Sequence, residues 1–252
     1  MKIKKLKPLL INIFKKHSLN MKHAETSANA LINAELVGAY GHGLSRLKMY
    51  CDRIKRNVIN PKPKIKIKRI SKSISHIDAN NSIGFVAADI GIKQAIKNAK
   101  NTGIGLVAIK NSGHYGLSGY YAEQAVKKNL ITMIYTNAPP AVAPYGASKS
   151  LFGTNPICFG APTGSNVPFI LDTSISVINR GKIRVAARNN QKIPEGVALD
   201  KFGKPTVDAK KALAGVQLPI ASFRGSGLAW MIDILSGVLT GGNHAGKVKD
   251  PF

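Results

Sequence analysis

The segment from residue 87 to residue 110 constrains the fold most, because it joins a helix directly to a strand. "AADIGIKQAIKNAKNTG" at 87–103 carries apolar residues at helical spacing and ends in Gly103, a residue that favours helix termination. The next residues, "IGLVAIK", form a short apolar run typical of a buried strand. Helices and strands intermix in the same way along the rest of the chain. The sequence therefore predicts a mixed α/β or α+β class with a substantial sheet.

The same segment contains a string that resembles a dinucleotide-binding fingerprint. "GIGLVA" at 103–108 fits G-x-G-x-x-A. In a Rossmann unit those glycines follow a strand and open a helix, where the pyrophosphate meets free N–H groups. Here they follow a helix and open a strand, so we interpret the match as accidental. No Walker, HExxH or GxSxG motif is present either.

Four further segments give local predictions. Residues 1–55 are expected to be helical, with a break at "YGHGLSR" (40–46), where two glycines interrupt the pattern. The Lys/Ile alternation at 62–74 predicts a half-buried strand with a solvated basic face. "HIDANNSIGF" at 76–85 predicts a polar turn into a helix. "SGLAWMIDILSGVLTGG" at 226–242 predicts a helix apt for burial.

Charge is the unusual global property of this chain. Lys and Arg number 37 against 12 Asp and Glu, which gives a formal net charge of +25. Such an excess attracts polyanions, nucleic acid included, and also steers small anionic substrates. No RNA- or DNA-binding signature accompanies it, and the 6% aromatic content is too low for a stacking platform. Compositional drift, a polyanion partner and substrate steering all stay open.

The cysteines and the N-terminus indicate a reducing compartment. Cys51 and Cys158 have no CxxC spacing, so neither a disulfide framework nor a zinc site is predicted, and no other metal site is indicated. The first 20 residues have an apolar stretch broken by Pro8 and Asn12, which favours an amphipathic helix over a signal peptide. No run approaches the ~20 apolar residues of a membrane span. We expect a cytoplasmic protein with no membrane partner.

Two of the six histidines stand in glycine-flanked joints between expected elements. His114, in "KNSGHYG" at 110–116, follows an apolar strand and has almost no side-chain bulk around it, which indicates a site where another molecule comes close. His42 has glycines on both sides and Arg46 four residues on. Arg binds a carboxylate bidentately, and a histidine exchanges a hydroxyl proton near neutral pH. The alternative interpretation is that His42 caps a helix and Arg46 is solvated.

Ten segments, in order, give the chain a family resemblance over nearly its full length. They are "GAYGHGLSRLKMY", "GFVAADIGIKQAI", "GIGLVAIKNSGHYG", "GYYAEQA", "YTNAPPAVAPYGA", "GTNPICFGAP", "PFILDTSIS", "GKI", "IPEGVALDKFGKPT" and "RGSGLAWMIDILSGVLTGG". In this the sequence resembles the malate/L-lactate dehydrogenase family, which includes ureidoglycolate dehydrogenase, diketogulonate reductase, sulfolactate dehydrogenase and Δ1-piperideine-2-carboxylate reductase. "NSGHYG" together with "GTNPI" is the specific part of the signal.

The resemblance implies a fold and an activity. The fold would be α/β with a largely antiparallel sheet, flanking helices and a non-Rossmann cofactor site. The protein would be a homodimer that transfers a hydride between NAD or NADP and a small 2-hydroxy acid or its 2-keto counterpart. Residues 1–80 would form the helical substrate and dimer region, and residues 81–252 the nicotinamide and catalytic region. The sequence selects neither between NAD and NADP nor among the possible acids.

The resemblance also implies roles for particular residues. His42 and His114 would line one cleft as proton donor or acceptor, Arg46 would grip the substrate carboxylate, and Asp200 would orient a histidine. The expected cofactor contacts are Ala138, Pro168, Phe169, Ile170, Leu171, Asp172, Thr173, Ser174, Phe223 and Arg224.

Three positions depart from the family pattern. Gly41 stands where members commonly have Ser, and Arg224 where they have Lys, which keeps the charge but changes the donor geometry. The chain ends at Phe252, without a counterpart of the family's tail, so the resemblance implies a C-terminally shortened fold. The alternative function is therefore a catalytically impaired family member with a polyanion-binding surface.

Overall fold

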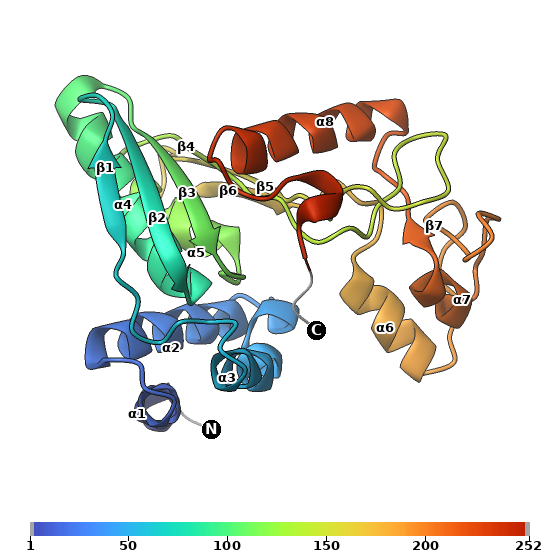
Figure 1. The fold of residues 1–252 in the computed structure, drawn as a ribbon, viewed down its shortest axis with the longest axis horizontal. Coiled ribbons are helices and arrows are strands. Elements are labelled where there is room, and N and C mark those ends of the chain that lie inside the picture. The colour runs from blue at the N-terminus through green and yellow to red at the C-terminus, as the bar shows by residue number, and fades with distance from the viewer. Residues whose placement is uncertain (1–2, 250–252) are drawn as a thin grey trace. The chain divides into compact units, whose positions relative to one another are not determined.

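The N-terminal region is helical, as predicted. In the computed structural model, which describes residues 3–249, its helices are α1 (Ile3–Lys16), α2 (Met21–Leu36) and α3 (Leu47–Lys55) (Figure 1). Leu6, Leu10 and Phe14 bury one face of α1, because residues four apart lie on the same side of a helix. Two short 3₁₀ turns, η1 (Tyr40–His42) and η2 (Leu44–Arg46), occupy the predicted glycine break.

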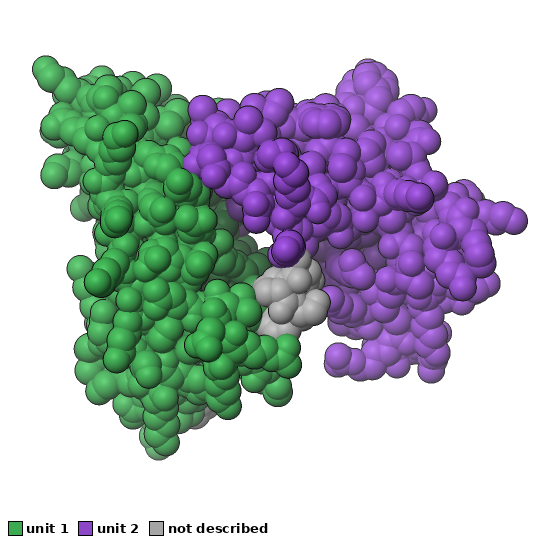
Figure 2. All heavy atoms as spheres, in the orientation of Figure 1, with its two compact units in different colours: residues 1–134, 158–171, 251 green, residues 135–157, 172–250, 252 purple. Residues whose placement is uncertain are grey.

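The described residues divide into two units by their contacts, coloured separately in Figure 2. Unit 1 comprises residues up to 134 together with 158–171, and unit 2 comprises 135–157 together with 172–249. The chain therefore leaves unit 1, returns to it and leaves it again. The predicted division at residue 80 concerns substrate and cofactor roles, and it stays a prediction.

A three-stranded mixed sheet forms the centre of unit 1. Its strands are β1 (Lys66–Arg69), β2 (Ile74–Ser82) and β3 (Leu106–Ser112), in the order β1-β2-β3. β1 pairs with β2 antiparallel, whereas β2 pairs with β3 parallel. The crossover between the parallel strands is α4 (Gly84–Thr102), which packs against both of them. The predicted mixed α/β class is confirmed.

Two local predictions in this sheet were wrong. β1 is not half-buried, because it is the edge strand while α4 packs against β2 and β3; Ile67 is 49% exposed. Residues 76–81 belong to β2 and are not a turn. Ile77 and Ala79 are buried and alternate with polar neighbours, a period-two pattern that the polar residues obscured.

The helix end at Gly103 and the strand after it are confirmed, but β3 is not a buried strand as predicted: none of its residues is fully buried, and Leu106 is 43% exposed. Gly103 caps α4 with φ +82°, and its N–H donates to Ala99 O at 2.8 Å. A Cβ at Gly105 would lie 2.1 Å from Ala95 O, so this glycine lets the chain turn back closely against α4. The two glycines of "GIG" therefore serve a tight helix-to-strand turn.

A second sheet, with the order β4-β5-β6, follows α5 (Ser118–Val126). Its strands are β4 (Thr132–Tyr135), β5 (Ile157–Ala161) and β6 (Phe169–Thr173). One face is packed, since a Cβ at Gly160 would touch Thr132, Val126 and Ile170. The alternate residues face the other way, and Met133, Phe169 and Leu171 are about half exposed there.

Unit 2 contains the remaining elements. They are α6 (Arg180–Arg188), β7 (Ala198–Leu199), α7 (Ala209–Ala214), β8 (Val216–Gln217), α8 (Phe223–Asp233), a π-helical turn at Ile234–Val238 and η4 (Ala245–Lys247). α8 is a helix as predicted, but its burial was predicted wrongly. α8 buries Ala229 and Ile232, whereas Trp230 is 49% exposed and Ile234, in the π-helical turn that follows, is 50% exposed. The apolar residues surround the helix, and unit 2 packs on one side of it. Among residues 3–249, no helix combines the length and apolarity needed to cross a membrane.

The start of α4 gives a test of this fold. A Cβ at Gly84 would lie 2.2 Å from Gly113 O and 2.4 Å from His114 O, so Gly84→Ala forces backbone apart. We expect it to lower the free energy of unfolding by about 2 kcal/mol or more, as overpacking does. The nearest atom to a Cβ at Gly113 is Ser82 O at 3.8 Å, so Gly113→Ala should change stability by less than about 1 kcal/mol. Urea unfolding measures both, and equal effects would contradict this packing.

Candidate active site

His42 is the last residue of η1, between α2 and α3. The glycine after it has a steric reason: a Cβ at Gly43 would collide with the Glu35 carboxylate. That carboxylate accepts the Leu44 N–H at 2.7 Å and so holds the start of η2. The glycine after His42 therefore lets the half-buried Glu35 carboxylate fix the turn that carries His42.

His114 lies just beyond the end of β3, next to the first residue of α4. Its backbone is in close contact with Gly84, as described above. Its Nδ1 lies 2.6 Å from the Tyr50 hydroxyl and accepts the Gly116 N–H at 3.3 Å. Tyr50 is fully buried on α3 and packs against Phe85, with ring centroids 4.7 Å apart. The His114 ring is thus held by α3 and by its own loop.

The structure brings the two predicted histidines together. The rings of His42 and His114 stack with centroids 5.6 Å apart and an interplanar angle of 8°. Both residues belong to unit 1, although they come from distant segments. Two imidazoles at this distance and a nearby Arg form a group that can exchange a proton and bind an anion.

The surroundings of His114 favour its neutral form. Burial is the main cause, and the positive charges of His42, Arg46 and Arg53 add to it; together they lower the pKa of His114 to about 3. Burial also raises the pKa of Tyr50 well above its usual value, so the phenol keeps its proton at neutral pH. The pair therefore consists of a protonated phenol and a neutral imidazole.

Arg46 lies at the end of η2, beside this pair. Its Nε donates to Gly41 O at 2.8 Å, and Nη1 lies 3.9 Å from Met49 Sδ. The first contact ties the guanidinium to the segment that carries His42. The side chain is half-buried, which is the setting in which an Arg fork binds a carboxylate well.

Asp200 lies in unit 2, and its carboxylate has local partners. It accepts the N–H groups of Phe202 at 2.9 Å and Lys204 at 3.0 Å. These backbone hydrogen bonds lower the pKa of Asp200. The residue closes a turn, and its predicted role in orienting a histidine stays a prediction.

The predicted cofactor residues fall into three groups. Phe169–Thr173 form β6, and Phe169 and Leu171 expose their side chains. Ala138 donates its N–H to Asn155 Oδ1 at 3.1 Å, and this fully buried Asn also donates to Ala229 O. Phe223 and Arg224 open α8, with the guanidinium carbon 5.0 Å from the Phe223 ring centroid.

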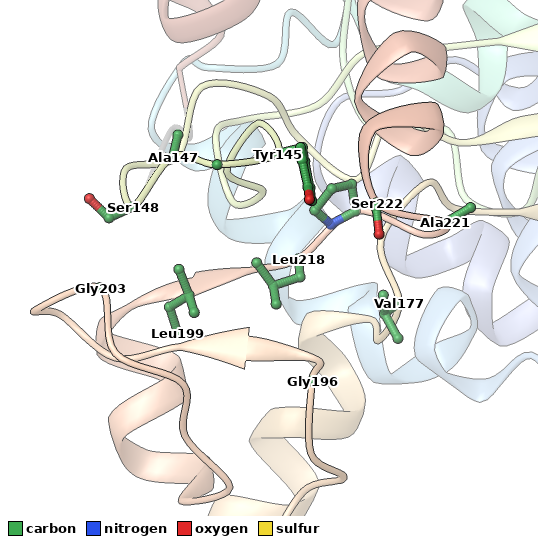
Figure 3. A pocket seen from close by; sticks show the side chains of 12 residues that line it. Tyr145, Ala147, Ser148, Val177, Gly196, Leu199, Gly203, Leu218, Ala221 and Ser222 are labelled. Carbon is green, nitrogen blue, oxygen red and sulfur yellow. The ribbon is translucent and has the colours of Figure 1, made fainter.

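A cavity of about 480 Å³ lies in unit 2 beside the start of α8 (Figure 3). Its wall consists of Tyr145, Gly146, Ala147, Ser148, Val177, Gly196, Leu199, Gly203, Leu218, Pro219, Ala221 and Ser222. Ala221 and Ser222 have φ of +47° and +56°, a strained conformation for residues with a Cβ. Tyr145 contacts Phe223 edge to face at 6.4 Å, which connects the cavity to a predicted cofactor residue.

Sequence reasoning missed Tyr50 and this cavity. Tyr50 looked like one more apolar position of a helix, and nothing in its neighbours signalled a partner in a distant loop. The cavity depends on two strained backbone positions whose sequence, "AS", carries no turn signal. Within residues 3–249, no three His, Cys, Asp or Glu side chains gather in a way that could hold a metal ion.

Known proteins are similar to this chain in sequence and in fold. A family model described as malate/L-lactate dehydrogenase matches residues 1–252. The chain belongs to this family. A malate/(S)-sulfolactate dehydrogenase from Methanothermus fervidus is 40% identical over 242 residues, which cover 96% of this chain and 71% of the relative. The structure of sulfolactate dehydrogenase from Methanocaldococcus jannaschii matches 99% of this chain and 72% of its own, with a TM-score of 0.93 and 40% identity.

The malate/L-lactate dehydrogenase family contains proteins named for different substrates and cofactors. A (2R)-3-sulfolactate dehydrogenase (NADP(+)) from Chromohalobacter salexigens is 37% identical over 229 residues, 91% of this chain and 68% of the relative. A ureidoglycolate dehydrogenase (NAD(+)) from Escherichia coli is 36% identical over 238 residues, 94% of this chain and 67% of the relative. The resemblance stated from the sequence is confirmed.

The half-buried His114 gives a prediction about stability and pH. Because its pKa is about 3 in the folded protein and about 6.5 when unfolded, its contribution is complete above pH 6.5 and is lost as pH falls toward 3. As pH falls, we expect the free energy of unfolding to decrease more steeply in the wild type than in His114→Gln, by up to about 1.4 kcal/mol per pH unit. Urea unfolding between about pH 6.5 and about pH 4 measures this, and the comparison cancels the titration of the carboxylates, which both proteins share. Parallel curves would contradict the neutral ring.

Proposed function

We propose that the protein is an NAD(P)-dependent oxidoreductase that interconverts a small 2-hydroxy acid and its 2-keto counterpart. The observation that carries this proposal is the stacking of His42 on His114 at 5.6 Å, with Arg46 tied to Gly41 beside them. Proton exchange at an oxygen next to a carboxylate needs this combination of groups. The family's named hydroxy-acid dehydrogenases support the same chemistry.

In this proposal each residue of unit 1 has a separate task. Arg46 binds the substrate carboxylate through its guanidinium and so places the neighbouring carbon and oxygen at the histidines. The imidazoles exchange the oxygen's proton and stabilise the charge that develops on it. The bare "NSGHYG" loop leaves room for the reacting groups at Gly113, whereas the space beside Gly116 is filled by the Phe85 ring.

The predicted cofactor residues have the chemistry that a nicotinamide dinucleotide needs. A nicotinamide dinucleotide supplies a hydride when reduced and accepts one when oxidised. In unit 2, the first turn of α8 opens beside the 480 Å³ cavity, and Arg224 adds a cation there. A helix N-terminus with a cation suits a phosphate group. We assign Phe223 and Arg224 to a phosphate or ribose of the cofactor, residues 168–174 to the nicotinamide nucleotide, and Ala138 to a further cofactor contact, as the resemblance implies.

Assembly and compartment belong to this proposal as well. The exposed apolar face of Met133, Phe169 and Leu171, and that of Trp230 and Ile234, support a homodimer in which a partner covers them. Cys51 and Cys158 are free and buried, which supports a reducing compartment such as the cytoplasm.

β1 favours a second candidate function. Its lysines and those just before it, including Lys64, Lys66 and Lys68, are exposed, and they form a basic edge that could bind a polyanion. A catalytically impaired protein would then be retained on a phosphate-rich matrix and give no signal in a titration with reduced nicotinamide cofactor. An enzyme gives that signal and turns over a keto acid. A panel of keto acids with NADH and NADPH separates the two and identifies the substrate.

The histidines give a kinetic test. We expect His42→Ala and His114→Ala each to lower kcat by ~100-fold or more, because each removes a group that acts on the substrate oxygen. The affinity for reduced cofactor should change much less. His23→Ala, which removes a half-buried histidine at the start of α2, serves as the control and should keep normal turnover. Near-normal rates in both site variants would remove the assignment.

The cofactor assignment has a separate test. Arg224→Gln should weaken cofactor binding about tenfold, since it removes a cation from the proposed phosphate site, while kcat at saturating cofactor stays close to normal. Arg188→Gln, at the exposed end of α6, is the matched loss of an arginine and should leave the dissociation constant unchanged. Fluorescence titration measures both. Equal effects of the two substitutions would point to general charge and not to a site.

A further inference from the structure

We propose that Tyr50 and the Gly116 N–H hold His114 as a neutral ring with its proton on Nε2, so that His114 donates a hydrogen bond to the substrate oxygen and His42 exchanges the proton. This division of roles rests on the proposed function. The tautomer itself rests on the structure alone and is testable without turnover.

The geometry around Nδ1 decides the tautomer. A backbone N–H can only donate, and the Gly116 N–H points at His114 Nδ1 at 3.3 Å. Nδ1 is therefore an acceptor, and a neutral imidazole with an unprotonated Nδ1 carries its proton on Nε2. The Tyr50 hydroxyl, 2.6 Å away, then completes the arrangement as a second donor. The opposite tautomer would set the Nδ1 proton against the Gly116 proton.

Tyr50 is fixed in this role by its surroundings. The ring is fully buried and packs against Phe85, so the hydroxyl has a defined position. Burial raises the pKa of Tyr50, which keeps the phenol protonated and able to donate. Tyr50 acts through His114 and is a positioning residue.

The charges around His114 also oppose a cationic ring. The titratable and charged groups that act on it are Tyr50 on α3, His42 on η1, Arg46 on η2 and Arg53 on α3. None of them is a carboxylate, and burial together with the charges of His42, Arg46 and Arg53 lowers the pKa of His114 to about 3. A neutral imidazole N–H is an effective donor to a developing alkoxide and needs no proton transfer of its own.

The proton balance then assigns the exchange to His42. In the reductive direction, the carbonyl carbon receives the hydride and the C=O π pair moves to oxygen. The oxygen takes a proton from the His42 imidazolium and keeps a hydrogen bond from His114 Nε2–H. His42 regains its proton from water, and oxidation reverses each step. If His114 instead gave up its Nε2 proton, Nδ1 would have to take the Tyr50 proton and leave a buried tyrosinate, which burial disfavours.

Nitrogen-15 NMR of histidine-labelled protein tests the tautomer, with His114→Gln identifying the His114 signals. We expect the wild type at neutral pH to show a neutral His114 with the proton on Nε2. Tyr50→Phe keeps the ring and its packing but leaves only the longer contact on Nδ1, the Gly116 N–H at 3.3 Å, so it should give a mixture of tautomers. Tyr121→Phe, which removes another buried donating hydroxyl of unit 1, should leave the pattern unchanged. A proton on Nδ1 in the wild type, or no change in Tyr50→Phe, would overturn the inference.

Kinetics test the division of roles. Because a Gln amide places an N–H near the Nε2 position, His114→Gln should recover at least about tenfold of the turnover lost in His114→Ala, with an unchanged pH profile. His42→Gln should be as slow as His42→Ala, since an amide exchanges no proton. Rescue at position 42 and none at 114 would overturn the assignment. If the wild type turned over no keto acid, the proposed function and the division of roles between His42 and His114 would both be wrong. The NMR experiment would still decide the tautomer of His114.

Discussion

The close approach of the start of α4 to the end of β3 governs the geometry of the candidate site. β2 and β3 are parallel, so both end at the same edge of the sheet, and Ser82 pairs with Ser112 there. The chain turns from β2 into α4 at Gly84, against the carbonyls of Gly113 and His114. One residue later Phe85 enters the core beside Tyr50. Strand pairing thus sets the helix start and, through two aromatic rings, the position of the His114 ring.

Much of this arrangement could be predicted where local patterns are strong. The helix ending at Gly103 and the strand after it follow from periodicity and from one left-handed glycine. The importance of His42 and His114 followed from their glycine surroundings, and their common site from a family resemblance. β2 was missed because its outward positions carry polar residues that resemble a turn. Tyr50 was missed because a side-chain contact across the fold leaves no local signal.

The charge of the chain has a definite consequence at the histidines. With 37 basic and 12 acidic residues, a cationic group in this protein meets other cations more often than acids. Arg46 and Arg53 act on His114 in this way and oppose its protonation. A substrate carboxylate bound at Arg46 would offset that repulsion, since an anion close to an imidazole favours its charged form. The site is thus electrostatically suited to the anion of a small acid.

The locked tautomer explains how two stacked imidazoles can work as one acid. Rings 5.6 Å apart repel when both are charged, so an unconstrained pair would share its proton and titrate in two coupled steps. Burial and the two donors on Nδ1 keep His114 neutral, so it does not take up the shared proton. His42 then carries the exchangeable proton alone, and substrate binding at Arg46 acts on a single titrating group. Because burial penalises the charged imidazolium, His114 stays a neutral hydrogen-bond donor and the proton transfer falls to His42.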